Sequence, residues 1–401
     1  MNATELDGVR VIAVEQAVAA PLCTRHLADL GADVVKIERP DGGDFARRYD
    51  GAVKGHSSHF VWLNRGKRSV VLNLKSQEGR LALRRLLSTA DVLVSNLAPG
   101  SFDRVITDDE LERLNTRLIR CYISGYGTTG PYAARKAYDL LVQGEAGTIA
   151  ATGTPDQRAK PGVSLADVAG GTYALAAVTA ALYARERTGR GERIDIALFD
   201  VLLEWMSPLL LAELSDGSAP EPAGLSHASI SPYGPYVTAD GETLLIAVQN
   251  DGQWRRLCEL VLRDPSLVSD PDLVSNDKRS RNRKKTEMIV NKSLSAMSTK
   301  EAVALLDLAD VPHGQLKQLR DVVAHEQARA TERWSPAHLP DGETVSVVTP
   351  PFYRNAEAQP GRAVPRLGEH TAAVLLAAGF SDAEVSQLTS ASAGERQMFR
   401  G

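Results

Sequence analysis

The sequence is poor in cysteine, and the three cysteines that it has form no pairing motif. Cys23, Cys121 and Cys258 lie far apart in a chain of 401 residues, and none of them belongs to a CxxC pair. A zinc cluster or a disulfide framework is therefore not expected, and this usage is typical of a reducing cytoplasm. The eight histidines include no HExxH or other ligand spacing, so no metal site is predicted.

Neither sign of charge dominates, since 46 Lys and Arg face 50 Asp and Glu. This balance argues against a general nucleic-acid binder. The basic run at 278–285 has acids on both sides and is interpreted as an exposed helix face. No basic segment followed by an apolar one opens the chain, and the apolar stretches are interrupted before they span a bilayer. We expect a cytoplasmic protein without nucleic-acid or membrane partners.

Apolar, strand-like runs alternate with helix-like segments through the first half of the chain. This rhythm predicts an α/β fold with a mainly parallel sheet covered by helices. A long alanine-rich helix is expected at 168–187 and a further strand at 192–200. The earlier strands are expected at 9–15, 33–40, 68–74, 91–97 and 119–127, with helices at 21–32, 76–90 and 107–118.

The composition changes near residue 206, which predicts a second, smaller domain. Hairpins are expected at 236–249 and 339–352, and a helix near 370–379. The predicted division is a large Rossmann-like domain over 1–205, a linker over 206–225, a small α+β domain over 226–325, and a return segment over 326–401.

Charged and polar residues follow the ends of several predicted strands. Arg39, Lys75 and Arg104 form a candidate anion site, because ligands of parallel sheets bind at the carboxyl ends of the strands. Each of them, taken singly, is also explained as solvated charge. The turn "EQAVAAPL" after the first strand lacks the GxGxxG glycines, which disfavours an ordinary NAD-dependent enzyme.

One carboxylate, Asp167 in "PGVSLADVAGG", stands among small and apolar residues before the alanine-rich helix. It is interpreted as a helix N-cap. A nucleophile is compatible with that role, because amide donors and the helix dipole would keep the carboxylate ionised. Gly170 and Gly171 would then leave room for a bulky acyl group.

Several long motifs occur in a characteristic order: "LDGVRVIAVEQAVAAPLCTRHLADLGADVVKIERP", "NRGKRSVVLNLKSQEG", "VSNLAPGSFDR", "YISGYGTTGPYA" and "VSLADVAGGTYALAAVTAALYARERTGRGERIDIALFD". With them, nearly the whole chain resembles the family III CoA transferases, which include formyl-CoA transferase. The resemblance implies a Rossmann-like large domain, a small domain, and a homodimer of two interlocked rings.

The resemblance also implies the site. Asp167 falls at the family's nucleophilic aspartate, and the substrates are an acyl-CoA and a free carboxylic acid, with no tightly bound cofactor and no metal. The residues at the family's coenzyme A contacts are Val18, Ala19, Arg39, Leu72, Lys75, Asn96, Leu97, Arg104, Lys136 and Tyr138.

Two departures from formyl-CoA transferase bear on the acid. Val18 stands where that enzyme has a glutamine, and "LSHASISPYGPY" replaces its glycine-rich flap. Both favour a larger acid than oxalate or formate, such as succinate, mesaconate, itaconate or citramalate. Two alternatives remain open, an α-methylacyl-CoA racemase and an inactive CoA-binding subunit. The racemases carry a histidine where this chain has Tyr138, and an unperturbed tyrosine is a poor base at neutral pH.

Overall fold

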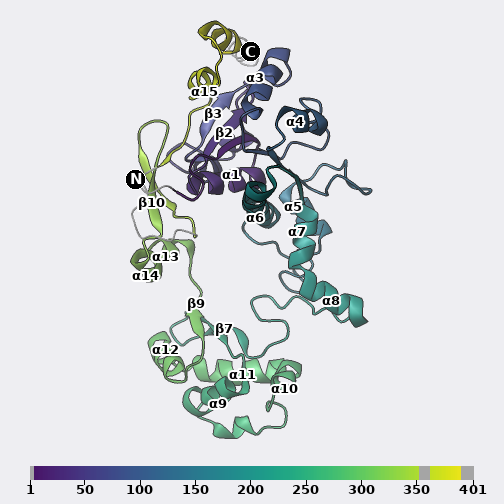
Figure 1. Ribbon diagram of the computed structural model, residues 1–401. Coiled ribbons are helices and arrows are strands. Elements are labelled where there is room, and N and C mark those ends of the chain that lie inside the picture. The colour runs from purple at the N-terminus through teal and green to yellow at the C-terminus, as the bar shows by residue number, and fades with distance from the viewer. Residues whose placement is uncertain (1–3, 352–361, 390–401) are drawn as a thin grey trace. The chain divides into compact units, whose positions relative to one another are not determined.

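The computed structural model describes residues 4–351 and 362–389 and divides the chain into two compact units (Figure 1). Unit 1 takes its described residues from 1–146, 161–207 and 329–401, and unit 2 consists of 147–160 and 208–328. Each unit has a buried apolar core of its own, and each is described separately.

Unit 1 is built on a six-stranded sheet whose strands all run parallel, as predicted. The strand order is β3-β2-β1-β4-β5-β6, so the chain winds first to one side of β1 and then to the other. In such doubly wound sheets, ligands bind outside the carboxyl ends of the strands where the order reverses, here between β1 and β4. The strands are β1 (Arg10–Val14), β2 (Asp33–Glu38), β3 (Arg68–Val71), β4 (Val92–Ser95), β5 (Ile119–Ser124) and β6 (Arg193–Ala197).

Helices cover both faces of this sheet, because alternate residues of a strand point to opposite sides. Val11 and Ala13 of β1 belong to the core shared with α1 (Ala19–Asp29) and α6 (Leu165–Thr188). Ile12 and Val14 belong to the other core, with α3 (Gln77–Leu87) and α15 (Thr371–Ala377) (Figure 1). The remaining helices of unit 1 are η1 (Phe45–Arg48), α2 (Ser58–Asn64), α4 (Asp108–Leu114), α5 (Asp139–Glu145) and α7 (Leu198–Trp205).

A small sheet in the return segment completes unit 1. The return segment contains a hairpin, in which β10 (Trp334–His338) pairs antiparallel with β11 (Thr344–Val348), and β12 (Arg362–Ala363) runs parallel to β10. The predicted range 339–352 contains the turn and β11, but the first strand lies before it. Phe60 of α2 shares a buried apolar cluster with Leu339 and Val364, which joins this sheet to α2. Phe352, the last residue of the predicted hairpin, lies outside the described residues.

Unit 2 is an α+β arrangement around an antiparallel sheet. The predicted hairpin at 236–249 is confirmed as β7 (Tyr233–Val237) and β8 (Thr243–Ala247), and β9 (His313–Gln315) pairs with β8. The unit's other elements are η2 (Leu257–Val261), η3 (Pro265–Val268), α9 (Asp251–Arg256), α10 (Asn276–Arg281), α11 (Arg283–Leu294), α12 (Thr299–Leu308), α13 (Leu319–Val323) and, at its limits, α8 (Ser207–Asp216) and α14 (Glu326–Ala330).

The basic run at 278–285 does not form a uniformly exposed face, and that interpretation is wrong at Arg279. The Arg279 side chain is fully buried, and it donates to the carbonyls of Ser231 at 3.0 Å and Leu273 at 2.9 Å. Its guanidinium also pairs with Asp251 at 2.9 Å. This arginine therefore stabilises unit 2 internally.

Helix α6 corrects the expectation that no apolar stretch is long enough to cross a membrane. Its 24 residues meet the length and hydropathy of a membrane span, the one such helix within the described parts of the chain. In unit 1, however, α6 packs on α1 and buries Ala174, Val178 and Ala181 in the core beside the sheet. Burial against other elements thus accounts for part of the apolar composition of α6, since 44 % of its apolar window is buried.

Candidate active site

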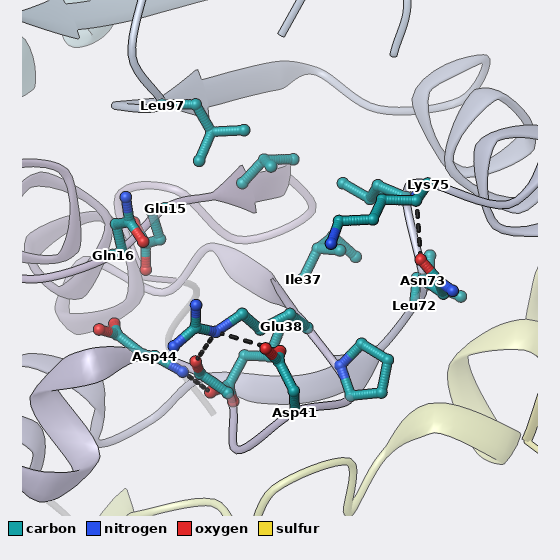
Figure 2. Close-up of a pocket in the computed structure, with 15 residues that line it drawn as sticks. Glu15, Gln16, Ile37, Glu38, Asp41, Asp44, Leu72, Asn73, Lys75 and Leu97 are labelled. Atoms are coloured by element: carbon teal, nitrogen blue, oxygen red, sulfur yellow. Dashed lines mark hydrogen bonds and ion pairs between the residues drawn. The ribbon is translucent and has the colours of Figure 1, made fainter. Parts of the chain in front are cut away.

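A pocket of about 490 Å³ lies at the carboxyl ends of β1 to β4, where the strand order reverses. Four of the residues predicted from the sequence line it, namely Arg39, Leu72, Lys75 and Leu97. They come from the loops that follow β2, β3 and β4, and Figure 2 shows Leu72, Lys75 and Leu97 around one cavity. The structure therefore brings together residues that are up to 58 positions apart in the sequence.

The two cations of this pocket differ in how they are held. Arg39 donates from Nε to the Gly43 carbonyl at 2.8 Å, pairs with Asp41 at 3.3 Å, and lies over the Phe45 ring at 4.4 Å. Lys75 is exposed, and its side chain extends toward the interior of the pocket (Figure 2). Lys75 is therefore the more adaptable of the two cations for an anionic ligand.

Asn96 stands at the reversal point itself and ties two strand ends together. Its Oδ1 accepts from the Gln16 amide at 2.9 Å, and its Nδ2 donates to the Gln16 carbonyl at 2.8 Å. The side chain thereby fixes the end of β1 against the end of β4.

Six of the ten predicted coenzyme A contacts do not line the pocket, namely Val18, Ala19, Asn96, Arg104, Lys136 and Tyr138. Arg104 is exposed and donates to Ser101 Oγ at 2.9 Å, and Lys136 is exposed as well. Tyr138 stands at the N-cap position of α5 with 72 % of its surface exposed. Val18 and Ala19, in contrast, are buried where α1 begins.

Sequence reasoning missed a buried network of charges, of which Glu15 and Asp44 line the pocket. Lys36 contacts Asp44 at 2.8 Å and Glu15 at 3.2 Å, and Lys67 contacts Glu15 at 2.7 Å. Burial alone would lower the pKa of Lys36, but Asp44 and Glu15 outweigh it and hold that pKa above its usual value. Burial lowers the pKa of Lys67 to about 8, although Glu15 counteracts it. A lysine inside a strand that is buried on both faces was the available signal.

This network sets the turn between the pocket and α1. Ala17 has a φ of +63°, which is rare for a residue with a Cβ. Its amide donates to Asp44 Oδ1 at 3.0 Å, while Asp44 Oδ2 accepts a hydrogen bond from Lys36 Nζ. Because Gln16 lines the pocket and α1 begins two residues after Ala17, the strained turn links the pocket to the start of that helix.

Asp167 lies in the first turn of α6, three residues after the N-cap. The N-cap is Ser164, whose side chain makes no capping hydrogen bond, so the N-cap interpretation of Asp167 is wrong. The expectation of a fully ionised carboxylate is also wrong. Burial, together with the negative charge of Asp139, raises the pKa of Asp167 to about 7. Removal from water outweighs the helix dipole here.

Gly170 and Gly171 serve helix packing, which corrects the expectation that they leave room for an acyl group. A Cβ on Gly171 would lie 2.5 Å from the Ala19 carbonyl oxygen, and one on Gly170 would lie 2.2 Å from a methyl carbon of Leu198. The two glycines therefore let α1 and α7 approach α6 closely. Through this contact Asp167 is held beside the start of α1.

Aromatic residues surround the same region. Burial raises the pKa of Tyr49, and the charges of Asp44 and Asp167 raise it further. The Tyr49 ring meets the His59 ring edge to face at 5.6 Å. On the apolar side, Val168 packs with Val18, Leu22 and Trp62. Sequence reasoning missed Tyr49, since an aromatic residue in a loop carries no local signal.

Comparison with known proteins shows the family of this chain. The model of CoA-transferase family III matches residues 6–371. The chain is 36 % identical to the succinate–glutarate CoA-transferase of Agrobacterium fabrum, over 92 % of this chain and 94 % of that protein. It is also 36 % identical to the acetyl-CoA:oxalate CoA-transferase of Acetobacter aceti, over 81 % and 84 %.

Among solved structures, a CAIB/BAIF family protein from Brucella suis superposes with a TM-score of 0.81 at 33 % identity. The match covers 94 % of this chain and all of that one. The chain belongs to CoA-transferase family III. It is an enzyme of the CoA-transferase class, and acyl-CoA and carboxylate substrates follow from that membership.

Proposed function

We propose that this enzyme moves coenzyme A between short dicarboxylic acids, with Asp167 as the nucleophile that is acylated during turnover. The observation that carries the proposal is the position of Asp167, half-buried in the first turn of α6 beside the start of α1, in a chain of this family. The acids that we propose are of the succinyl, mesaconyl, itaconyl or citramalyl type. The Agrobacterium relative named for succinate and glutarate supports the dicarboxylate class.

The proposed reaction needs no net proton, metal or redox partner. An Asp167 oxygen attacks the thioester carbonyl carbon, the C–S bond breaks, and the electron pair leaves on sulfur as the CoA thiolate. The thiolate attacks the aspartyl carbonyl of the mixed anhydride, which releases the donor carboxylate and leaves CoA bound to Asp167 as a thioester. The acceptor carboxylate attacks this thioester, and the same two steps in reverse order release the new acyl-CoA and the Asp167 carboxylate.

We place the nucleotide end of coenzyme A in the pocket at the carboxyl ends of β1 to β4. Arg39 and Lys75 supply positive charge there, and Leu72 and Leu97 supply apolar walls. Val18 and Ala19 then direct the chain of the ligand past the start of α1 toward Asp167. Holding the long ligand at one end fixes the thioester near the nucleophile, which is the source of the rate gain from proximity. Asn96, Arg104, Lys136 and Tyr138 complete the proposed contacts.

An interlocked homodimer is part of the proposal. Helix α8 buries none of its residues within the chain, and Leu214 is 83 % exposed. An uncovered apolar helix of this kind is typical of a subunit interface. Sedimentation at micromolar concentration should give twice the chain mass of 43.2 kDa. A cytoplasmic location stays a prediction from composition.

The relative named as an acetyl-CoA:oxalate CoA-transferase suggests oxalate as the alternative to a longer dicarboxylate as acceptor. Val18 contributes only an apolar surface beside Asp167, which favours an acid with a carbon chain between its carboxylates. Assay of succinyl-CoA with glutarate, mesaconate and oxalate as acceptors decides this point. A higher kcat/KM for oxalate than for both longer acids would remove the dicarboxylate assignment.

One observation favours racemase chemistry as a second candidate. A carboxyl with a pKa of about 7 is well suited to proton transfer at neutral pH. Against it, racemisation needs a second acid–base group across the α-carbon, and Tyr138 is a weak choice for that role. Incubation with a 2-methylacyl-CoA in heavy water, without acceptor acid, distinguishes the two. Deuterium exchange at the α-carbon would support the racemase, and its absence together with CoA transfer would support the proposal.

A further inference from the structure

The start of α6 is capped by a residue of another helix. Ser164 occupies the N-cap position without using its side chain, and Asp139, the first residue of α5, supplies the acceptor instead. Asp139 Oδ1 accepts from the Ala166 amide at 2.8 Å and from the Asp167 amide at 3.3 Å. Its other oxygen, Oδ2, accepts from Gln143 Nε2 at 2.6 Å, within the same helix. The carboxylate is thus held by three donors.

We propose that Asp139 is a positioning residue for Asp167. Asp139 fixes the backbone that carries the nucleophile, and its negative charge repels the Asp167 carboxylate. The inference rests on the proposed function, because it assigns no role to Asp139 unless Asp167 is acylated. Asp139 itself contacts no reacting atom in this account. It acts through the two amide hydrogen bonds and through its charge.

The repulsion between Asp139 and Asp167 changes during the reaction cycle. Two carboxylates close together repel each other while Asp167 is free. When Asp167 attacks the thioester, its negative charge leaves with the CoA sulfur, and the acylated side chain is neutral. Repulsion from Asp139 therefore disfavours the resting enzyme and is relieved in both covalent intermediates. A more basic carboxylate is also the stronger nucleophile, and the raised pKa of Asp167 agrees with this.

Asp139 is the charged group that matters for this effect. Burial and Asp139 are the two causes of the shift in the pKa of Asp167. Ionisable groups stand on every element that packs against α6, and none of the others contributes to that shift. They are Cys23, Arg25, His26 and Asp29 on α1, Glu145 on α5, Asp200 and Glu204 on α7, Arg120, Cys121 and Tyr122 on β5, and Arg193 and Asp195 on β6.

Two variants separate the effect of the amide hydrogen bonds to residue 139 from the effect of its negative charge. Asp139→Asn keeps an oxygen for the amides of Ala166 and Asp167 and removes the charge, and the Gln143 amide can rotate to accept from the new nitrogen. Asp139→Ala removes both the cap and the charge. The matched control is Glu145→Gln, which removes a carboxylate from the far end of the same helix, where Glu145 pairs with Arg135 at 3.5 Å.

The experiment measures kcat/KM of the purified enzyme from pH 5 to 9, with succinyl-CoA and glutarate, and the Tm of each variant. Asp139→Asn should move the acid limb of the profile down by about one pH unit and lower the plateau kcat several-fold. Asp139→Ala should lower kcat a further tenfold or so at every pH, since the amides lose their acceptor. Glu145→Gln should follow the wild type in both respects.

An unchanged acid limb and plateau in a folded Asp139→Asn enzyme would overturn the inference, and so would equal activity of the Asn and Ala variants. Failure of the proposed function itself is recognised separately. Wild-type enzyme quenched during turnover would then lack any adduct on Asp167, whatever the Asp139 variants do.

Discussion

The amide of Ala17 donates a 3.0 Å hydrogen bond to Asp44, and Ala17 holds a φ of +63° at that point. The other oxygen of Asp44 contacts buried Lys36 at 2.8 Å. A buried charge thus supports an unfavourable backbone turn at the edge of the pocket. Strain of this kind persists only where the surroundings over-determine it.

Removal of Asp44 should therefore disturb both stability and ligand binding. Asp44→Ala leaves the Ala17 amide without its acceptor and Lys36 with one carboxylate fewer, so we expect a loss of about 3 kcal/mol or more in the free energy of unfolding. The KM for acyl-CoA should rise with it. Urea denaturation measures the first effect, and Asp41→Ala, an exposed acid of the same loop, should lose less than about 0.5 kcal/mol. Equal stability of the two variants would contradict this role of Asp44.

The close approach of α1 and α6 gives a second prediction. A methyl group on Gly171 would lie 2.5 Å from the Ala19 carbonyl oxygen, so Gly171→Ala forces the helices apart. We expect a loss of about 1–3 kcal/mol, as in other overpacked sites. Gly162→Ala is the control, because a Cβ there meets nothing within 4 Å. Thermal melts of both variants test the point, and a Gly171→Ala protein as stable as the control would refute the packing argument.

Lys75 should act on binding more than on chemistry. Its removal takes one positive charge from the pocket and leaves Asp167 in place, so Lys75→Ala should raise the KM for succinyl-CoA about tenfold with little change in kcat. The effect should shrink at high salt, since exposed charges are screened. Arg113→Ala, which removes an exposed cation from α4, should leave KM unchanged. A fall in kcat at constant KM would place Lys75 elsewhere in the reaction.

The raised pKa of Asp167 predicts a pH dependence of stability. The folded chain keeps a proton on Asp167 up to about pH 7, whereas the unfolded chain releases it near the ordinary aspartate pKa of 3.8. Stability should therefore fall as the pH rises from about 4 to 7, because the unfolded state binds fewer protons in that window. Asp167→Asn carries no such group, so its Tm should exceed that of the wild type most clearly at pH 8. An equal difference in Tm between this variant and the wild type at pH 4 would contradict the raised pKa of Asp167.

The strands of the six-stranded sheet and the longer helices of unit 1 were predictable from the sequence, and the details of the site were not. Periodicity places the run around Val11 to Val14 in a buried strand, and strand ends point to Arg39 and Lys75. Short helices such as α2 and α5 were not predicted, because seven residues carry too little periodicity. The strand expected at 192–200 ends at Ala197, where α7 begins.

Interactions between distant segments account for what sequence reasoning missed. The packing role of Gly171 depends on Ala19, more than 150 residues earlier, and the pKa of Asp167 depends on Asp139 in a separate helix. Local sequence favours the helix dipole at a position such as 167, and only the fold shows that burial outweighs it. The family resemblance supplied the site residues, and their roles stay proposals.

The most direct measurement is mass spectrometry of the peptide that contains Asp167, from enzyme quenched in acid during turnover with succinyl-CoA. The account predicts an acyl or coenzyme A adduct on Asp167, lost after hydroxylamine treatment and missing from a folded Asp167→Asn variant that makes no product. Product formation with an unmodified Asp167 peptide at every time point, or normal turnover by that variant, would contradict it.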